Sequence, residues 1–81
     1  MRLDKYLKVS RIIKRRTIAN EVCDAKRCSV NGKTARASYE VKVGDIVELQ
    51  MGQSLTKFEV LSVTQHATKE DSKTMYRTIN N

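Results

Sequence analysis

The sequence predicts one small α+β domain, in which an N-terminal helical hairpin precedes a small antiparallel sheet. Apolar residues recur at helical spacing through the first 25 positions, and the spacing changes to alternation after residue 27. The pair Asn31-Gly32 then marks a hairpin turn. A chain of 81 residues can bury only one modest core, which leaves no room for separate binding and catalytic domains.

Two helices are expected at the N-terminus. Between residues 2 and 9, apolar residues recur at i, i+3 and i+4 from Leu3, and basic residues occupy the opposite side. A second apolar set begins at Ile18, which predicts a helix from about residue 16 to residue 25 with Thr17 available as its cap. The two apolar stripes should face each other.

The strands follow these helices. Residues 28–30 lead into Asn31-Gly32, a pair that suits the positive φ angles of a type I′ turn. The stretch after this turn ends at residues 41–43, and residues 46–49 alternate between apolar and polar side chains, as in a strand. Residues 55–63 are predicted as the last strand, so the domain is expected to span residues 1–63.

Residues 64–81 form a polar C-terminal tail. The spacing of Met75, Tyr76 and Ile79 would let a brief helix dock on the domain, and a disordered tail is the alternative.

The positive charge is concentrated at one end of the chain. The net charge is +7, and residues 1–33 alone carry ten basic and three acidic side chains. Residues 34–63 sum to −1 and residues 64–81 to +1. A protein that is basic only for solubility would spread this charge, so the asymmetry indicates a face for a polyanion, with nucleic acid as the leading candidate.

The run Lys14-Arg15-Arg16 stands where the second helix should begin. Cations there oppose the helix dipole, so helix stability does not explain them. Guanidinium groups beside free N–H groups can instead hold a phosphate, and Arg2, Lys5 and Arg11 on the facing helix favour this over a solvated charge run. Asp4 could hold a neighbouring arginine or cap the first turn, and the sequence leaves both roles open.

Other functions have weaker support. A DNA-binding helix-turn-helix would place the acidic Glu21 and Asp24 against the DNA groove, which would repel them. The few aromatic side chains do not form a platform on which single-stranded bases could stack. His66 has no partner for catalysis, and Cys23 and Cys28 lack the further ligands of a zinc site. We therefore expect no enzyme activity, cofactor or metal, and recognition of folded RNA by its phosphate geometry. A redox sensor built on the two cysteines stays as a further alternative.

Several blocks of the sequence resemble the S4 RNA-binding domain over about residues 1–50. These blocks are Arg2-Leu3-Asp4-Lys5-Tyr6-Leu7, Ser10-Arg11, Lys14-Arg15-Arg16-Thr17 with Ala19, Val30-Asn31-Gly32, and Ser38, Val41 and Gly44-Asp45. The resemblance implies an S4-type (alpha-L) fold. It also implies an RNA face made of Arg2, Lys5, Arg11, Lys14, Arg15, Arg16, Thr17 and Lys33.

The N-terminal block and the pattern Met75-Tyr76 with Ile79 are most similar to the ribosome-quality-control members of this family. Such a protein is expected to be a cytoplasmic monomer with no membrane partner. It would bind 23S ribosomal RNA and peptidyl-tRNA on the obstructed large subunit, and support a partner factor that adds an untemplated alanine tail. A general large-subunit assembly or chaperone-like role is the alternative.

The chain departs from the family at one position. Many S4 domains end the second helix with a glycine, but this chain has Ala25-Lys26-Arg27 there. The helix is therefore expected to end without the usual left-handed glycine.

Overall fold

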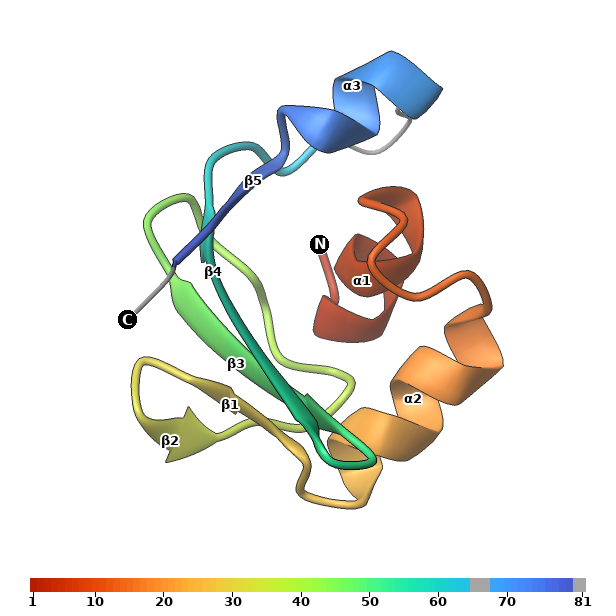
Figure 1. Cartoon of the computed structure of the whole chain (residues 1–81), viewed down its shortest axis with the longest axis vertical. Helices are drawn as coiled ribbons and strands as arrows, with labels where there is room; N and C mark the ends of the chain where they lie inside the picture. Colours follow the sequence, from red (N-terminus) through yellow and green to blue (C-terminus); the bar gives the residue numbers. More distant parts are fainter. Residues whose placement is uncertain (65–67, 80–81) are drawn as a thin grey trace.

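The computed structural model describes residues 1–64 and 68–79, which form three helices and one five-stranded antiparallel sheet (Figure 1). The helices are α1 (Leu3–Val9), α2 (Arg16–Asp24) and α3 (Lys69–Lys73). The strands are β1 (Cys28–Val30), β2 (Lys33–Thr34), β3 (Ile46–Met51), β4 (Ser54–Val60) and β5 (Tyr76–Thr78), in the order β2-β1-β3-β4-β5. The α+β prediction is confirmed.

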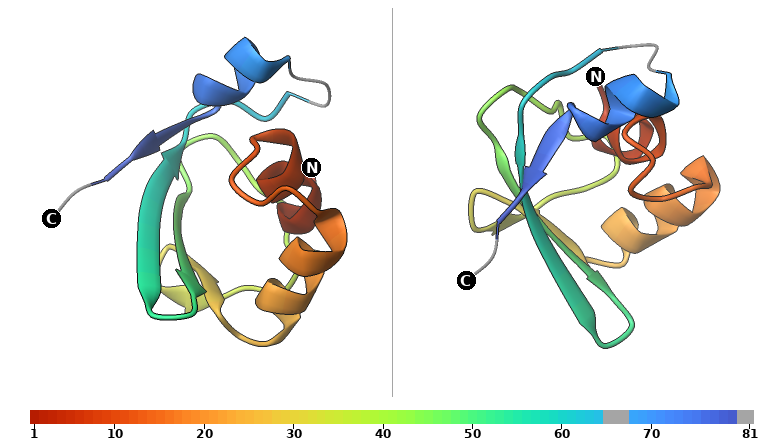
Figure 2. Two further views of the ribbon diagram at one scale, coloured as in Figure 1. Left: turned by 45° about the vertical axis from the view of Figure 1, so that its right-hand side comes forward. Right: turned by 45° about the horizontal axis from the view of Figure 1, so that its top comes forward.

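The hairpin of α1 and α2 covers one face of the sheet (Figure 2). The core between them contains Leu3, Tyr6 and Leu7 of α1, all fully buried. Phe58 of β4 stacks on the Tyr6 ring at a centroid distance of 6.3 Å. The helical spacing that predicted α1 therefore also identified the side that faces the sheet.

The segment between β2 and β3 lies against the start of α1. The backbone N–H of Leu3 donates to the carbonyl of Tyr39 at 2.8 Å, and that of Asp4 donates to Ala37 at 3.1 Å. These bonds satisfy N–H groups that have no partner within the helix. Between the hairpin turn and residues 41–43, only β2 is therefore a strand. The carbonyl groups that follow β2 accept hydrogen bonds from the start of α1 instead of from another strand.

The hairpin turn forms as predicted. Asn31 and Gly32 have φ angles of 53° and 85°, the signs that a type I′ turn requires. The Asn31 side chain also donates to the Asp45 carboxylate at 3.1 Å and accepts the Ile46 N–H at 2.9 Å. The turn is therefore tied to the start of β3.

Lys26 follows the last residues of α2 and takes the left-handed conformation itself, at φ 64°. The N–H of Lys26 donates to the carbonyl of Cys23, and the N–H of Arg27 donates to that of Val22, both at 3.1 Å. These two bonds make a Schellman ending, which normally uses glycine. The chain therefore has lysine where many S4 domains have glycine, but its backbone still follows the left-handed ending.

The C-terminal segment differs from the prediction. Met75 and Tyr76 are not helical: the helix is α3, and Tyr76 begins β5, which pairs with β4. A capping box formed by Thr68 and Asp71 starts α3 earlier than the apolar spacing suggested. Met75 is buried, and its carbonyl accepts the Tyr6 hydroxyl at 2.7 Å.

Two further points concern the described ranges, 1–64 and 68–79. None of their helices has the length and apolar character needed to cross a bilayer. The prediction for His66 lies outside the described residues.

Candidate nucleic-acid interface

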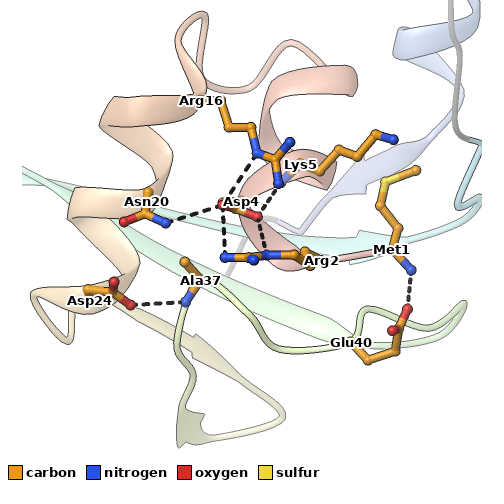
Figure 3. A network of polar contacts seen from close by, with 9 residues as sticks. All are labelled: Met1, Arg2, Asp4, Lys5, Arg16, Asn20, Asp24, Ala37 and Glu40. Carbon is orange, nitrogen blue, oxygen red and sulfur yellow. Dashed lines mark hydrogen bonds and ion pairs between the residues drawn. The ribbon is translucent and has the colours of Figure 1, made fainter.

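A buried carboxylate joins the two helices of the hairpin (Figure 3). Asp4 is only 2% exposed, and it accepts hydrogen bonds from Arg2 Nε at 3.2 Å and Arg16 Nε at 3.4 Å. It also accepts from Asn20 Nδ2 at 3.3 Å and from the backbone N–H of Lys5 at 2.8 Å. Asp4 therefore holds arginines, the first of the two roles that the sequence left open. It is not the cap of α1, because the cap position is Arg2, although it does accept the N–H of Lys5 in the first turn.

The Asp4 carboxylate is ionised at neutral pH. Burial raises its pKa, but the hydrogen bonds from Asn20 and the Lys5 backbone and the charges of Arg16 and Arg2 lower it more, so the pKa of Asp4 lies below its ordinary value. A fixed negative charge is thus available to orient two guanidinium groups.

The two arginines keep much of their surface available. Arg2 is 50% exposed and Arg16 is 49% exposed, and the Asp4 pairing uses their Nε edges. Together with Thr17 and Asn20 they line a hollow between α1 and α2. Glu21 lies at this hollow as well. An oriented guanidinium can donate two parallel bonds to a phosphate, and the pairing reduces the entropy lost on binding.

Thr17 does not cap α2. The cap position is Arg15, which makes no side-chain cap bond, and Thr17 is the second residue of the helix. Thr17 nonetheless lines the same hollow as Arg2 and Arg16, two other residues of the predicted RNA face.

The other predicted cations divide into two groups. Arg11, Lys14 and Arg15 are exposed on the connection between α1 and α2, and none of them forms an ion pair with any residue that the structure describes. Arg11 lies just after α1 and takes the left-handed conformation, at φ 63°. Lys5 is half-buried on α1.

Lys33 is separated from this group. It lies on β2 and lines a different hollow, with Asn31 and Tyr39. The structure therefore brings Arg2, Arg16 and Thr17 to one site and places Lys33 at another.

Sequence reasoning missed Asn20, which donates to Asp4 and lines the hollow. Its position one turn after Arg16 on the same side of α2 is the signal that could have identified it.

The two cysteines lie in the core. Cys23 and Cys28 are free and buried, and the described residues contain no group of three or more potential metal ligands. A hydrogen bond with Cys23 and burial both raise the pKa of Cys28, which keeps this thiol protonated and unreactive.

Known proteins resemble this chain over almost its whole length. It is 53% identical to the RQC P-site tRNA stabilizing factor of Streptococcus pneumoniae over 98% of this chain and 90% of that protein. It is 50% identical to the protein of the same name from Bacillus subtilis, over 94% and 88% of the two chains.

The solved structures agree on the fold. The trimeric Heat Shock Protein 15 of Vibrio cholerae superposes with a TM-score of 0.89 at 24% identity, covering 98% of this chain and 81% of that one. The solution structure of hypothetical protein HP1423 gives 0.84 at 28% identity, covering 100% and 99%. The S4 domain family model matches residues 1–47, the part that contains α1, α2 and the Asp4 site. The chain belongs to the S4 domain family.

Proposed function

We propose that this protein is a non-enzymatic RNA-binding factor that stabilises peptidyl-tRNA in the P site of an obstructed large ribosomal subunit. The observation that carries RNA binding is the pair of half-exposed arginines, Arg2 and Arg16, fixed by one buried carboxylate. Support for the particular RNA comes from relatives at 46–53% identity that are named RQC P-site tRNA stabilizing factors.

The mechanism is electrostatic docking on RNA phosphates. Arg2 and Arg16 bind phosphate with guanidinium groups that Asp4 already orients, and Arg11, Lys14 and Arg15 add charge that no described carboxylate neutralises. Such contacts recognise the backbone geometry of folded RNA and read no base sequence. Stabilising a bound tRNA requires only that the protein bind the loaded subunit more tightly than the empty one.

The proposed partners are 23S ribosomal RNA, peptidyl-tRNA and the factor that adds the alanine tail, all in the cytoplasm. The family resemblance supports them. We further propose that one copy of the chain acts alone, although the similar Heat Shock Protein 15 is trimeric in its solved structure. Light scattering of the purified protein should give the monomer mass of 9.3 kDa, and a mass three times larger would contradict this.

Sedimentation of lysates tests the proposal. Cells are treated with a drug that stalls translation, and the tagged protein is followed across free large subunits, whole ribosomes and the unbound fractions. Enrichment on large subunits that carry peptidyl-tRNA, only after stalling, is the expected result. Binding to large subunits regardless of stalling would favour an assembly role, and protein at the top of the gradient at low salt would exclude the ribosome as partner.

A further inference from the structure

A second group of cations lies at the far end of α2. Lys26 and Arg36 line a hollow together with Cys23, Asp24 and Thr34. Figure 1 shows where this end lies: α2 runs away from its junction with α1 and ends at the turn that leads into β1. This hollow shares no residue with the one that Arg2 and Arg16 line.

The position of Lys26 carries a steric cost. Its φ of 64° belongs to the left-handed region, which glycine adopts freely and a side chain with a Cβ does not. Backbone N–H groups already satisfy the last carbonyls of α2, so the ammonium group is not needed as a hydrogen-bonding cap. A cation does interact favourably with the negative end of the helix dipole, and the test below separates that contribution from binding.

The backbone also holds Arg36 beside the helix end. Asp24 Oδ1 accepts the N–H of Ala37 at 3.2 Å, which fixes the chain next to Arg36 (Figure 3). In the part of the chain that the structure describes, no carboxylate lies within 4 Å of a charged nitrogen of Lys26, Arg27 or Arg36. The hollow therefore has two unpaired cations at its edge.

The two hollows lie along the same side of α2. Thr17, Asn20 and Asp24 are spaced by three and four residues, so they face the same way, and Figure 3 shows Asn20 and Asp24 on one side of the helix. A helix of nine residues is about 13 Å long, so one phosphate cannot reach both ends. Glu21 lines the first hollow and Asp24 lines the second, so an RNA backbone that followed α2 continuously would pass both carboxylates and be repelled by them.

We propose that the hollow of Lys26 and Arg36 is a second phosphate-binding site, which takes a phosphate of an RNA segment other than the one held by Arg2 and Arg16. This inference rests on the proposed RNA-binding function. It adds that RNA phosphates bind at two separate sites on the protein. The ligand chemistry is an RNA phosphate, supplied either by the large-subunit RNA or by the tRNA.

Lys26→Gly is the decisive variant. If Lys26 binds phosphate, the substitution should lower RNA affinity without lowering the melting temperature, whereas if Lys26 only stabilises the helix end, it should lower the melting temperature and leave the affinity unchanged. Glycine relieves the left-handed strain, so the melting temperature should stay the same or rise. The loss of one phosphate contact should weaken RNA binding about tenfold and make the salt slope shallower by about 0.7 to 0.9. Lys26→Arg keeps the charge and the strain, and should bind within about twofold of the wild type.

Affinities are measured by fluorescence anisotropy against two probes: isolated large subunits without tRNA, and free tRNA. Arg36→Gln should reproduce the loss, whereas Lys42→Gln, which removes an exposed cation elsewhere, should not. A loss confined to one probe assigns the phosphate to that RNA. Combining Arg16→Ala with Lys26→Gly should multiply the two losses, because separate sites act independently.

Failure of this inference can be distinguished from failure of the proposed function. If Arg16→Ala weakens binding while Lys26→Gly and Arg36→Gln bind as Lys42→Gln does, the second site is wrong and the RNA-binding function stands. If Lys26→Gly lowers the melting temperature and leaves affinity unchanged, Lys26 serves only the helix end. If none of these variants binds RNA less tightly, both proposals fail.

Discussion

Asp4 determines the geometry of the arginine site. It is nearly inaccessible to water, yet its carboxylate accepts hydrogen bonds from three side chains and one backbone N–H. A buried carboxylate is stable only when such partners compensate its lost hydration. The same residue therefore supports the packing of α1 on α2 and presents two guanidinium groups to the outside.

Replacing Asp4 by Asn tests this dual role. Asn is similar in shape but carries no charge, so Asp4→Asn should lower the free energy of unfolding by about 1–3 kcal/mol and also weaken RNA binding. Urea unfolding followed by circular dichroism measures the first effect, and anisotropy measures the second. Normal affinity in a destabilised variant would contradict the orienting role.

The pH dependence of Asp4→Asn provides an internal control. The pKa of Asp4 is lowered in the folded state, so the stability it contributes is present above its unfolded pKa of about 3.9 and is lost as pH falls through the folded value. The difference in unfolding free energy between wild type and variant should thus be constant near neutrality and shrink in acid below about pH 4.

Arg16→Ala should weaken RNA binding about tenfold, because one oriented phosphate contact disappears. Arg2 and Asn20 still compensate Asp4, so the unfolding free energy should fall by no more than about 1 kcal/mol. Arg77→Ala is the matched control: it removes the same charge from an exposed pair with Glu59 on the sheet. Equal losses in the two variants would mean that only net charge matters.

At the scale of the elements, local signals predicted the N-terminal half well. The spacing from Leu3 gave α1, and Asn31-Gly32 gave the turn, because each depends on residues close together in the chain. The C-terminal segment was harder, because Met75 and Tyr76 are extended through pairing with β4, a contact with residues far away in the sequence. Three apolar residues at helical spacing could not reveal that partner.

The C-terminal segment contributes to the core. Met75 is 1% exposed, so Met75→Ala should lower the free energy of unfolding by about 2–4 kcal/mol. Leu61→Ala removes a side chain that is 43% exposed and should cost less than about 1 kcal/mol. Thermal unfolding compares the two variants. Similar small losses would show that the segment does not support the domain.

At the scale of the molecule, the excess positive charge lies on the N-terminal part of the fold. The basic residues of positions 1–33 lie on or next to α1 and α2, on their connection and in the first hairpin, whereas the rest of the chain is nearly neutral. These charges led to the prediction of a face for a polyanion. The sequence could not show that Asp4 joins Arg2 to Arg16, or that Lys26 and Arg36 line one hollow, because these arrangements form only when the segments fold together.

RNA binding should therefore depend steeply on salt. About five or six phosphate contacts predict a slope of roughly −4 to −5 in a plot of log affinity against log salt concentration. Anisotropy titrations of wild-type protein with purified large subunits, at several potassium chloride concentrations, measure it. A nearly flat plot would be incompatible with electrostatic docking.

The affinity of purified large subunits for peptidyl-tRNA tests the central claim most directly. A protein that binds the loaded subunit more tightly must, at equilibrium, make the subunit bind the tRNA more tightly in return. Wild-type protein should therefore lower the dissociation constant of peptidyl-tRNA about fivefold or more, and the Arg16→Ala variant should lower it less. The same dissociation constant with and without the wild-type protein would contradict the account.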